Sequence, residues 1–350
     1  MAFDTIPIQP SYLDGCRYRR TIYPVSLGTA RNTPYISYRG YEPVVTTFPL
    51  AYAKDYGWNG GVLATNGYIH MVPSSSYIGQ KFSPEGVAST YSLPWTTSGG
   101  MNFSGGVVGV NGDIYFLPTG QNRYTSVCGM AVKTSGVVSS FTFPVTKSWG
   151  YDSGALAGDG CIYLAPRNAN NGCKINPDGT FSTYALPYTC ANAYSGAVAD
   201  RTGFVHFVPH SSPVGMKVAS DGTHSTYSLV YTRSYNYAGG VLAQNGDIHF
   251  VPLQSTIGQK VSESGVVSTY SLALAGNYYY SGGACGANGD IHFVPKAQTI
   301  CQKISSAGIV STYATPPYTF AQNSFTGGVV DQNGNVYFIP YNANFVIKLS

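Results

Sequence analysis

One recurring position of this chain carries either histidine or tyrosine, two polar rings that could bind a metal ion or transfer a proton. Four of the seven copies are histidine, whose imidazole titrates nearest to neutral pH. Successive copies are separated by a whole sequence repeat, so the rings are not expected to converge, and tyrosine replaces histidine in three of them. We therefore predict packing between neighbouring repeats with one hydrogen bond each. The residues are His70, Tyr115, Tyr163, His206, His249, His292 and Tyr337.

A lysine follows this ring position in six repeats, and Ala131 replaces it in the remaining one. Its ammonium group could bind phosphate or suppress protonation of the neighbouring histidine. Alternatively, the aliphatic stem could simply cross the protein surface with the charge in water. We favour this last interpretation because the arginines and glycine-rich loops of a phosphate site are missing. The lysines are Lys81, Lys174, Lys217, Lys260, Lys303 and Lys348.

An aromatic residue stands two positions before the first glycine of most repeats, and Asp152 interrupts this series. Exposed rings at the start of the first strand would form a platform on which sugar rings stack. Buried rings would instead fill space between repeats, and we favour this second interpretation. The aromatic residues are Trp58, Phe103, Tyr194, Tyr237, Tyr280 and Phe325.

Aromatic residues also occur in the loops that precede each repeat, where the sequence varies most. Variable loops on a rigid scaffold commonly carry recognition, so we predict contacts with a glycan or a protein partner there. The spacings of known catalytic and nucleotide-binding motifs do not occur, so we expect no catalytic residue, no metal and no cofactor. The candidate contact residues are Trp95, Trp149, Tyr188, Tyr231, Tyr235, Tyr278 and Tyr279.

These positions recur because one unit, GGVLxxNGDIHFVP in its commonest form, is repeated seven times at spacings of 42–49 residues. In the copy from Gly239 to Leu272, turn residues separate four short apolar runs. The dipeptide Asn245-Gly246 is a strong hairpin signal. Four antiparallel strands at this period predict the blade of a β-propeller. The copies begin at Gly60, Gly105, Gly154, Gly196, Gly239, Gly282 and Gly327.

The two ends of the chain indicate how the ring of blades closes. The last repeat ends at Ser350 after its third strand, and residues 44–50 repeat the pattern of an outer strand before the first complete copy. Pairing of these segments would complete the seventh blade and remove a free strand edge. We predict an all-β, seven-bladed β-propeller of four-stranded antiparallel blades over residues 44–350, closed by residues 44–50.

The composition favours rigid, neutral β structure. Only 10% of the residues are charged, against about 25% in an average protein, and 30 residues are tyrosine. The net charge of +4 is scattered along the chain, so we expect no nucleic-acid partner. We also expect no signal peptide and no membrane insertion. The seven cysteines do not follow the repeat; Cys161 and Cys173 could face each other, but buried free thiols are expected.

The repeat pattern of N-G, an aromatic residue, F-x-P, a lysine and an S-T-Y-x-L outer strand resembles the blades of streptogramin B lyase-like propellers. The resemblance covers about residues 44–350 and implies a seven-bladed ring. Members of that family are lyases whose activity needs histidine and glutamate residues together with a divalent metal, so the resemblance also implies this activity. The uniform tyrosine- and serine-rich repeats further resemble tandem propeller repeats of bacteriophage virion proteins.

Residues 1–43 are rich in proline and tyrosine and do not follow the repeat. They predict an extended arm that packs on another surface, and we interpret the arm as an anchor to other virion proteins. Its candidate contact residues are Arg17, Arg19, Arg20 and Tyr23.

Three functions from different classes fit these observations. We favour a non-enzymatic structural or attachment protein of a bacteriophage particle, either a capsid decoration or a tail component. It would be assembled in the host cytoplasm and display the propeller for assembly or contact with the host surface. A carbohydrate-binding, lectin-like propeller is the second hypothesis and is compatible with the first. The third is a lyase-like enzyme, which only the analogy of fold supports.

Overall fold

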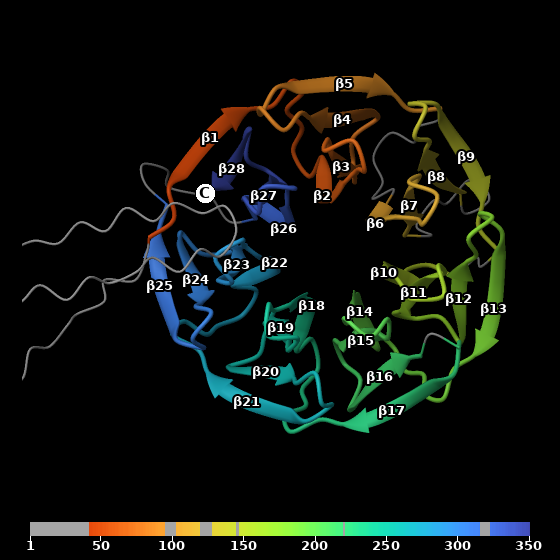
Figure 1. Ribbon diagram of the computed structural model, residues 1–350, viewed down its shortest axis with the longest axis vertical. Coiled ribbons are helices and arrows are strands. Elements are labelled where there is room, and N and C mark those ends of the chain that lie inside the picture. Colours follow the sequence, from red (N-terminus) through yellow and green to blue (C-terminus); the bar gives the residue numbers. More distant parts are fainter. Residues whose placement is uncertain (1–41, 95–102, 120–127, 145–146, 220, 316–322) are drawn as a thin grey trace, which may run out of the picture. The chain divides into compact units, whose positions relative to one another are not determined.

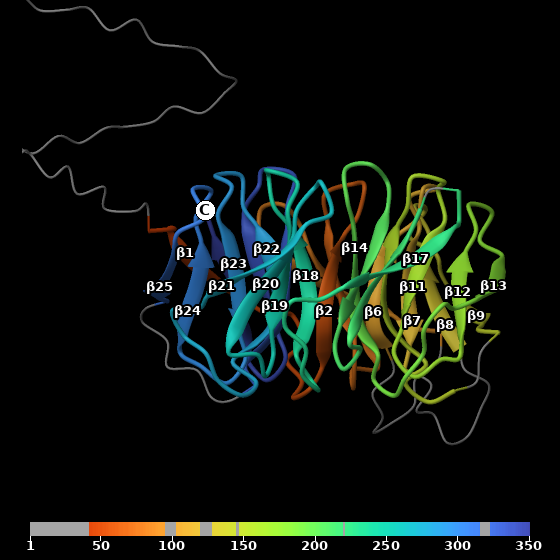
Figure 2. The ribbon, with the colours of Figure 1, turned by 90° about the horizontal axis from the view of Figure 1, so that it is seen from below.

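The computed structural model describes residues 42–94, 103–119, 128–144, 147–219, 221–315 and 323–350. These residues form seven four-stranded antiparallel sheets arranged around a central channel (Figure 1). Seen from the side, the ring of sheets is a flat disc with loops on both faces (Figure 2). Within the described ranges, no helix is long and apolar enough to span a membrane. The prediction of an all-β, seven-bladed β-propeller is confirmed.

Each blade contains four consecutive strands, numbered here outward from the channel. The first strands are β2 (Trp58–Leu63), β6 (Phe103–Val108), β10 (Tyr151–Leu156), β14 (Tyr194–Ala199), β18 (Tyr237–Leu242), β22 (Tyr280–Cys285) and β26 (Phe325–Val330). The second strands are β3 (Ile69–Pro73), β7 (Ile114–Pro118), β11 (Ile162–Pro166), β15 (Val205–Pro209), β19 (Ile248–Pro252), β23 (Ile291–Pro295) and β27 (Val336–Pro340). We call the blades 1 to 7 in this order.

The outer half of each blade is made in the same way. The third strands are β4 (Ile78–Phe82), β8 (Cys128–Val132), β12 (Asn171–Ile175), β16 (Val214–Val218), β20 (Ile257–Val261), β24 (Ile300–Ile304) and β28 (Phe345–Leu349). The outer strands of blades 1 to 6 are β5 (Ala88–Ser92), β9 (Val138–Thr142), β13 (Phe181–Ala185), β17 (His224–Ser228), β21 (Val267–Ser271) and β25 (Val310–Ala314). Blade 7 takes its outer strand from the other end of the chain, β1 (Val45–Pro49).

The ring closes where β1 pairs with β28, as predicted for residues 44–50. The two strands are antiparallel, with Val45 opposite Leu349. Just beyond them, the amide of Val44 donates to the carbonyl of Ser350 at 3.1 Å, and the reverse bond is 3.0 Å long. The ring of Phe48 packs edge-on against Tyr337 of the same blade at 5.9 Å between centroids. Closure thus removes the exposed strand edge that a truncated seventh blade would have.

Tight turns with glycine join the strands, as blade 5 illustrates. In the turn between β18 and β19, the amide of Gly246 donates to the carbonyl of Ala243 at 3.0 Å, and Gly246 has a φ of 87°. A side chain would be strained at that angle, which explains why the Asn-Gly dipeptide is a reliable sign of this hairpin. The side chain of Asn245 also accepts a hydrogen bond from the amide of Asp247 at 3.1 Å.

Neighbouring blades approach most closely along the channel, where their first strands carry glycine. A Cβ atom added to Gly327 of blade 7 would lie 2.8 Å from the Cα atom of Gly60 in blade 1. The same holds for Gly196 against Gly239, at 2.7 Å. Since real Cβ atoms do not tolerate such distances, the missing side chains allow seven wedge-shaped sheets to meet around a narrow axis.

The hydrophobic core lies between the blades. One cluster joins Val62 and Val72 of blade 1 to Phe103, Phe116 and Met130 of blade 2. Similar clusters occur between other neighbouring blades. Burial of a large apolar side chain contributes roughly 1.5–3 kcal/mol. A single four-stranded blade cannot bury both of its faces, so the ring is the smallest unit that excludes water from them.

The predicted division into an arm of residues 1–43 and a propeller of residues 44–350 stays a prediction. All but two residues of the arm lie outside the described residues, and so do Arg17, Arg19, Arg20 and Tyr23.

Candidate functional site

The recurring histidine or tyrosine of the second strand is buried in every blade, with at most 6% of its surface exposed. Each of the four histidines has Nδ1 at 2.8–3.4 Å from a tyrosine hydroxyl on the outer strand of its own blade. Tyr163 instead donates to Asp159 at 2.9 Å and packs among core residues of blade 4. The predicted packing between blades is confirmed for Tyr115, Tyr163 and Tyr337, which lie in core clusters that join two blades. The hydrogen bonds of the histidines lie within their own blades, and His206 has a second one, from Nε2 to Asp200 at 3.4 Å.

The outer strand supplies a partner that matches the residue of the second strand. Histidine faces tyrosine, whereas tyrosine faces phenylalanine in two of its three blades. In blade 3, tyrosine faces tyrosine, and the buried hydroxyl of Tyr184 has no hydrogen-bond partner. The pairs are His70–Tyr91, His206–Tyr227, His249–Tyr270, His292–Tyr313, Tyr115–Phe141, Tyr337–Phe48 and Tyr163–Tyr184.

Burial lowers the pKa of these histidines. The pKa of His70, His249 and His292 falls from 6.5 to about 4, because the buried ring loses solvation of its charged form. The ammonium group of Lys81 lowers the pKa of His70 further. The rings are therefore neutral at pH 7, and each already has its Nδ1 engaged with a tyrosine. Their role is structural.

The recurring lysines of the third strand interact with their own blades. Two form ion pairs with the aspartate of the first turn, and four lie with the ammonium group over an aromatic ring. The expectation that the charge is carried into water is wrong for Lys303, which is buried, whereas the other five lysines are partly exposed. The ion pairs are Lys260–Asp247 (2.6 Å) and Lys303–Asp290 (2.9 Å), and the ring contacts are Lys81–Tyr68, Lys174–Tyr163, Lys217–Phe204 and Lys348–Tyr337.

The aromatic residues at the start of the first strands are almost completely buried. This confirms that they fill space between the blades and do not form an exposed platform for sugar rings. The interruption predicted at Asp152 is wrong. Blade 3 has Ser153 where other blades have their first glycine, so counting back from Gly154 shifted the register by one residue. Tyr151 fills the aromatic position with 2% exposure. Asp152 instead occupies the next position, which faces the channel.

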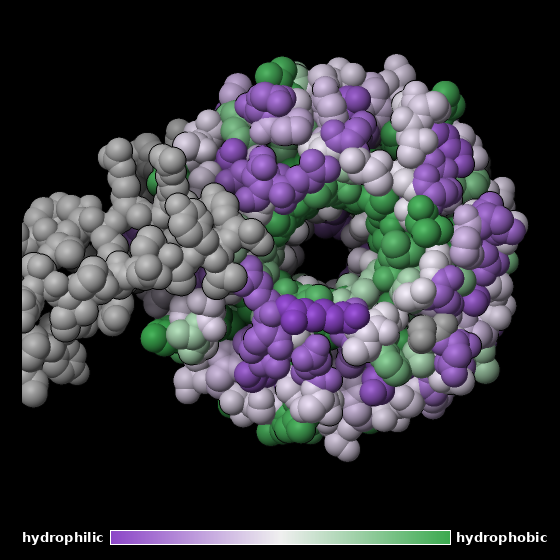
Figure 3. Space-filling model, in the orientation of Figure 1, coloured by the Kyte–Doolittle hydropathy of each residue, from purple (hydrophilic) through white to green (hydrophobic). Residues whose placement is uncertain are grey.

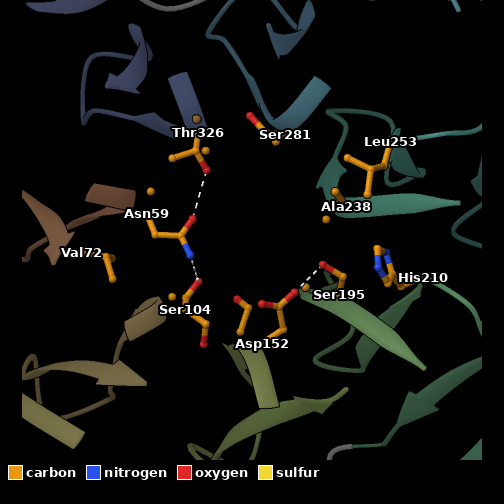
Figure 4. Close-up of a pocket in the computed structure, with 18 of the residues that line it drawn as sticks. Asn59, Val72, Ser104, Asp152, Ser195, His210, Ala238, Leu253, Ser281 and Thr326 are labelled. Atoms are coloured by element: carbon orange, nitrogen blue, oxygen red, sulfur yellow. Dashed lines mark hydrogen bonds between the residues drawn. The ribbon is translucent and has the colours of Figure 1, made fainter. Parts of the chain in front are cut away.

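This next position of the first strand forms a ring of small or polar side chains around the channel (Figure 4). Asp152 and Ser195 point toward each other, and the serine hydroxyl donates to the carboxylate. Between blades 1 and 2, the side-chain amide of Asn59 donates to the backbone carbonyl of Ser104 at 3.0 Å. The ring consists of Asn59, Ser104, Asp152, Ser195, Ala238, Ser281 and Thr326. Asp152 is its one carboxylate.

This ring and the side chains at one end of it line a cavity of about 500 Å³, which we call the channel mouth. Two sets of side chains border it. One set comes from the turns that lead into the first strands, and includes Trp149, Tyr235 and Tyr278. The other set immediately follows the proline that ends each second strand, and includes Arg167, His210, Leu253, Lys296 and Tyr341. Figure 3 shows hydrophobic residues lining the channel and hydrophilic residues on the face around it.

The turn residues at the mouth have an unusual backbone conformation. Trp149, Tyr235 and Tyr278 have φ angles of 52°, 57° and 59°, and Tyr56, which does not line the cavity, has 56° at the same position of blade 1. The same turn position in blades 4 and 7 is asparagine. Asparagine tolerates this left-handed region, but a bulky side chain there costs on the order of 1–2 kcal/mol. Tyr235 and Tyr278 are 40% and 43% exposed, so burial does not explain the choice of residue.

Charged groups from distant blades face the same cavity. Arg167 of blade 3 lies 3.6 Å from Asp152 (Nη1 to Oδ1) and has its guanidinium 5.0 Å from the ring centre of Trp149. Lys296 of blade 6 lies 5.6 Å above the ring of Tyr278. Burial lowers the pKa of Lys296, and the positive charge of Arg167 lowers it further, although Asp152 opposes this.

His210 of blade 4 lies beside these charges and is 3% exposed. Its Nδ1 donates to the backbone carbonyl of Tyr237 at 2.9 Å, and its ring is 5.0 Å from that of Tyr235. Since a carbonyl only accepts, the proton of the neutral ring is on Nδ1. Nε2 therefore carries a lone pair, and it has no hydrogen-bond partner. Burial also lowers the pKa of His210.

The structure brings three of the seven predicted contact residues together at the mouth, namely Trp149, Tyr235 and Tyr278. Tyr188 and Tyr279 are half-buried and pack against the core between blades instead. The half-buried Tyr231 does not line the cavity, and its amide donates to Gln259 at 2.8 Å. Trp95 lies outside the described residues.

The sequence interpretation missed Arg167, His210 and Lys296. A different amino acid follows the strand-ending proline in each blade, and most of these residues are polar, whereas the residues before the proline repeat. This variable position within a uniform repeat could have indicated the site. The seven residues are Ser74, Thr119, Arg167, His210, Leu253, Lys296 and Tyr341.

The described residues contain no group of three histidine, cysteine or acidic side chains that could hold a metal ion. Cys161 and Cys173 are buried free thiols, as expected. Burial raises the pKa of Cys173 to about 12, so this thiol is protonated at neutral pH.

No family model and no curated protein matches the chain. Several solved structures share its architecture. A streptogramin B lyase structure superposes with a TM-score of 0.73 at 18% identity, over 88% of this chain and 97% of that one. A catalytically inactive histidine-to-alanine variant of virginiamycin B lyase from Staphylococcus aureus, with quinupristin, gives 0.73 at 15% identity over 88% and 99%.

A third similar structure is the extracellular domain of a putative hybrid two-component system from B. thetaiotaomicron. It gives a TM-score of 0.65 at 11% identity, over 89% of this chain and 41% of that one. The resemblance to phage virion propellers has no counterpart among these three. At such identities the comparisons establish fold alone: the chain is a seven-bladed β-propeller similar to those of the streptogramin B lyase type.

Proposed function

We propose that this chain is a non-enzymatic attachment protein of a bacteriophage particle, and that its channel mouth binds a carbohydrate on the host surface. In this proposal residues 1–43 anchor it to other virion proteins, as a capsid decoration or tail component. Assembly takes place in the host cytoplasm, without nucleic acid or membrane insertion. The lectin-like and the structural hypotheses are thereby combined in one molecule.

The observation that carries the binding part is the set of aromatic residues in strained turns. Tyr235 and Tyr278 adopt positive φ angles and remain exposed beside the cavity. Asparagine, which stands at this position in two other blades, would relieve the strain. Residues that keep an unfavourable conformation without gaining burial are typical of binding sites. Exposed, rigid aromatic rings beside a cavity of about 500 Å³ suit the apolar faces of sugars.

Support for an attachment protein comes from the uniformity of the scaffold. The recurring histidines and lysines are engaged within their blades, by tyrosine hydroxyls, aspartates or aromatic rings. Variation is concentrated at one end of the channel and in the residues before the ring. This division suits a rigid display platform with one contact surface and one anchor.

The binding part is tested with an array of bacterial surface polysaccharides. The variant Tyr235→Asn/Tyr278→Asn should lose at least tenfold in affinity for a polysaccharide that the unmodified chain binds, while its thermal stability is retained or rises. Tyr77→Asn serves as the control, because Tyr77 is 48% exposed and does not line the cavity. Equal binding by both variants, or no bound polysaccharide for the unmodified chain, contradicts the proposal.

The anchoring part is tested by deleting residues 1–43 and retaining residues 44–50. The truncated chain should still fold, because β1 and its pairing with β28 are kept. In purified phage particles, immunodetection should find the full chain and not the truncated one. Equal incorporation of both would refute the anchor.

A further inference from the structure

The cations of the channel mouth outnumber its anions. Among the described residues that border the cavity, Arg167 and Lys296 are positive and Asp152 is the acidic one. Asp152 is already engaged, since one carboxylate oxygen accepts from Ser195 and the other lies 3.6 Å from Arg167. One positive charge at the mouth thus remains without compensation.

That charge is on Lys296. Its side chain is half-buried, and no described carboxylate lies within ion-pair distance of its ammonium group. The contrast with Lys260 and Lys303 is informative, because both pair with an aspartate of their own blade. Burial of a cation close to a second cation is unfavourable unless an anion joins them. The lowered pKa of Lys296 reflects the same two causes.

His210 indicates a second property of the ligand, a hydrogen-bond donor. His210 borders the cavity, its Nε2 is buried and unpartnered, and Nδ1 holds the ring proton against the carbonyl of Tyr237. Figure 4 shows the imidazole among the residues that surround the cavity. A buried acceptor without a donor costs free energy. A hydroxyl group of a ligand would supply that donor.

We propose that the ligand of the channel mouth is an acidic saccharide, with a carboxylate held between Lys296 and Arg167 and a hydroxyl donating to Nε2 of His210. The flanking rings of Tyr235 and Tyr278 contact the apolar face of the sugar. This inference rests on the proposed function for the location of the ligand and specifies its chemical class.

Isothermal titration calorimetry of the full chain tests the charge of the ligand. The probes are oligosaccharides that end in a uronic or sialic acid, each measured beside its methyl ester, which keeps the sugar and removes the charge. The acid form should bind at least tenfold more tightly than its ester, and the difference should shrink as the salt concentration rises. Neutral parent oligosaccharides complete the panel.

Two variants assign the charge to residues. Lys296→Gln and Arg167→Gln should each bind the acid form only as tightly as the ester, whereas the exposed Lys54→Gln should match the unmodified chain. Without ligand, Lys296→Gln should melt no lower than the unmodified chain, because it removes a repulsion. A lower melting temperature would mean that Lys296 is structural, and would overturn the inference.

The outcomes separate the two proposals. Equal affinity for acid and ester overturns the acidic ligand and leaves carbohydrate binding in place. Binding of neutral sugars alone would likewise overturn the acidic ligand and leave carbohydrate binding in place. If no oligosaccharide of any kind binds, both the inference and the proposed carbohydrate contact fail together.

Discussion

Acidification should destabilise the propeller through its buried histidines. His70, His249 and His292 have a pKa of about 4 in the folded chain, against 6.5 for the exposed imidazole. The folded state therefore binds a proton less readily than the unfolded state. Stability is fully present above pH 6.5 and is lost as the pH falls from 6.5 toward 4.

The size of the effect follows from the two pKa values. At pH 5 an imidazole with a pKa of 6.5 is almost fully protonated, whereas one with a pKa of about 4 is mostly neutral. The free energy of unfolding falls by about 2 kcal/mol for each such histidine, so three together cost about 6 kcal/mol between pH 7 and pH 5. The pKa of His206 is also lowered, which adds to the loss.

Blade 2 provides the design for a variant that does not titrate. There Tyr115 replaces the histidine, Phe141 replaces its tyrosine partner, and the amide of Asn111 donates to the tyrosine hydroxyl at 3.1 Å. The double variant His249→Tyr/Tyr270→Phe transfers this arrangement to blade 5, where Asn245 corresponds to Asn111.

Urea unfolding, followed by tryptophan fluorescence from pH 4.5 to 7.5, measures the difference. The variant should lose about 2 kcal/mol less between pH 7 and pH 5 than the unmodified chain, with a similar stability at pH 7. The single variant Tyr270→Phe is the control, since it keeps the titrating imidazole. An unchanged pH dependence in the double variant would show that burial of His249 does not govern acid stability.

Three other substitutions test the packing of the ring, with thermal or urea unfolding as the measurement. Tyr184→Phe removes a buried hydroxyl without a partner and should leave stability unchanged or raise it by up to about 1 kcal/mol; a loss would mean that the hydroxyl has a partner. Gly327→Ala should cost about 2 kcal/mol more than Gly60→Ala, because both have positive φ but only the first adds a Cβ 2.8 Å from a neighbouring blade. Equal costs would remove the argument from close approach. Phe48→Ala should destabilise by about 2–3 kcal/mol by weakening closure at β1, whereas deletion of residues 1–43 should not, and an equal effect of both would contradict the closing role of β1.

Most of the fold was predictable because its signals are local. A pair such as Asn245-Gly246 fixes a hairpin by backbone geometry alone, and each blade repeats it. The unpaired outer-strand pattern in residues 44–50 sufficed to predict closure onto the last blade. The one error of register, at Asp152, arose where serine replaced the glycine from which positions were counted.

Less of the candidate site was predictable. Sequence variation indicated the loops, and Tyr235 and Tyr278 do border the cavity. Tyr188 and Tyr279 come from similar loops, but they pack against the core. Whether a loop aromatic faces water or a neighbouring blade depends on the backbone path of the turn, and composition does not encode that path.

The sequence by itself determined the number of blades, the order of their strands and the closing strand, because turn chemistry and strand alternation act between residues close along the chain. Only the tertiary structure decided which side chains share the channel mouth. Asp152, Arg167, His210 and Lys296 come from three blades and are up to 144 residues apart in sequence. They meet because the ring, once closed, brings equivalent positions of all blades to one axis.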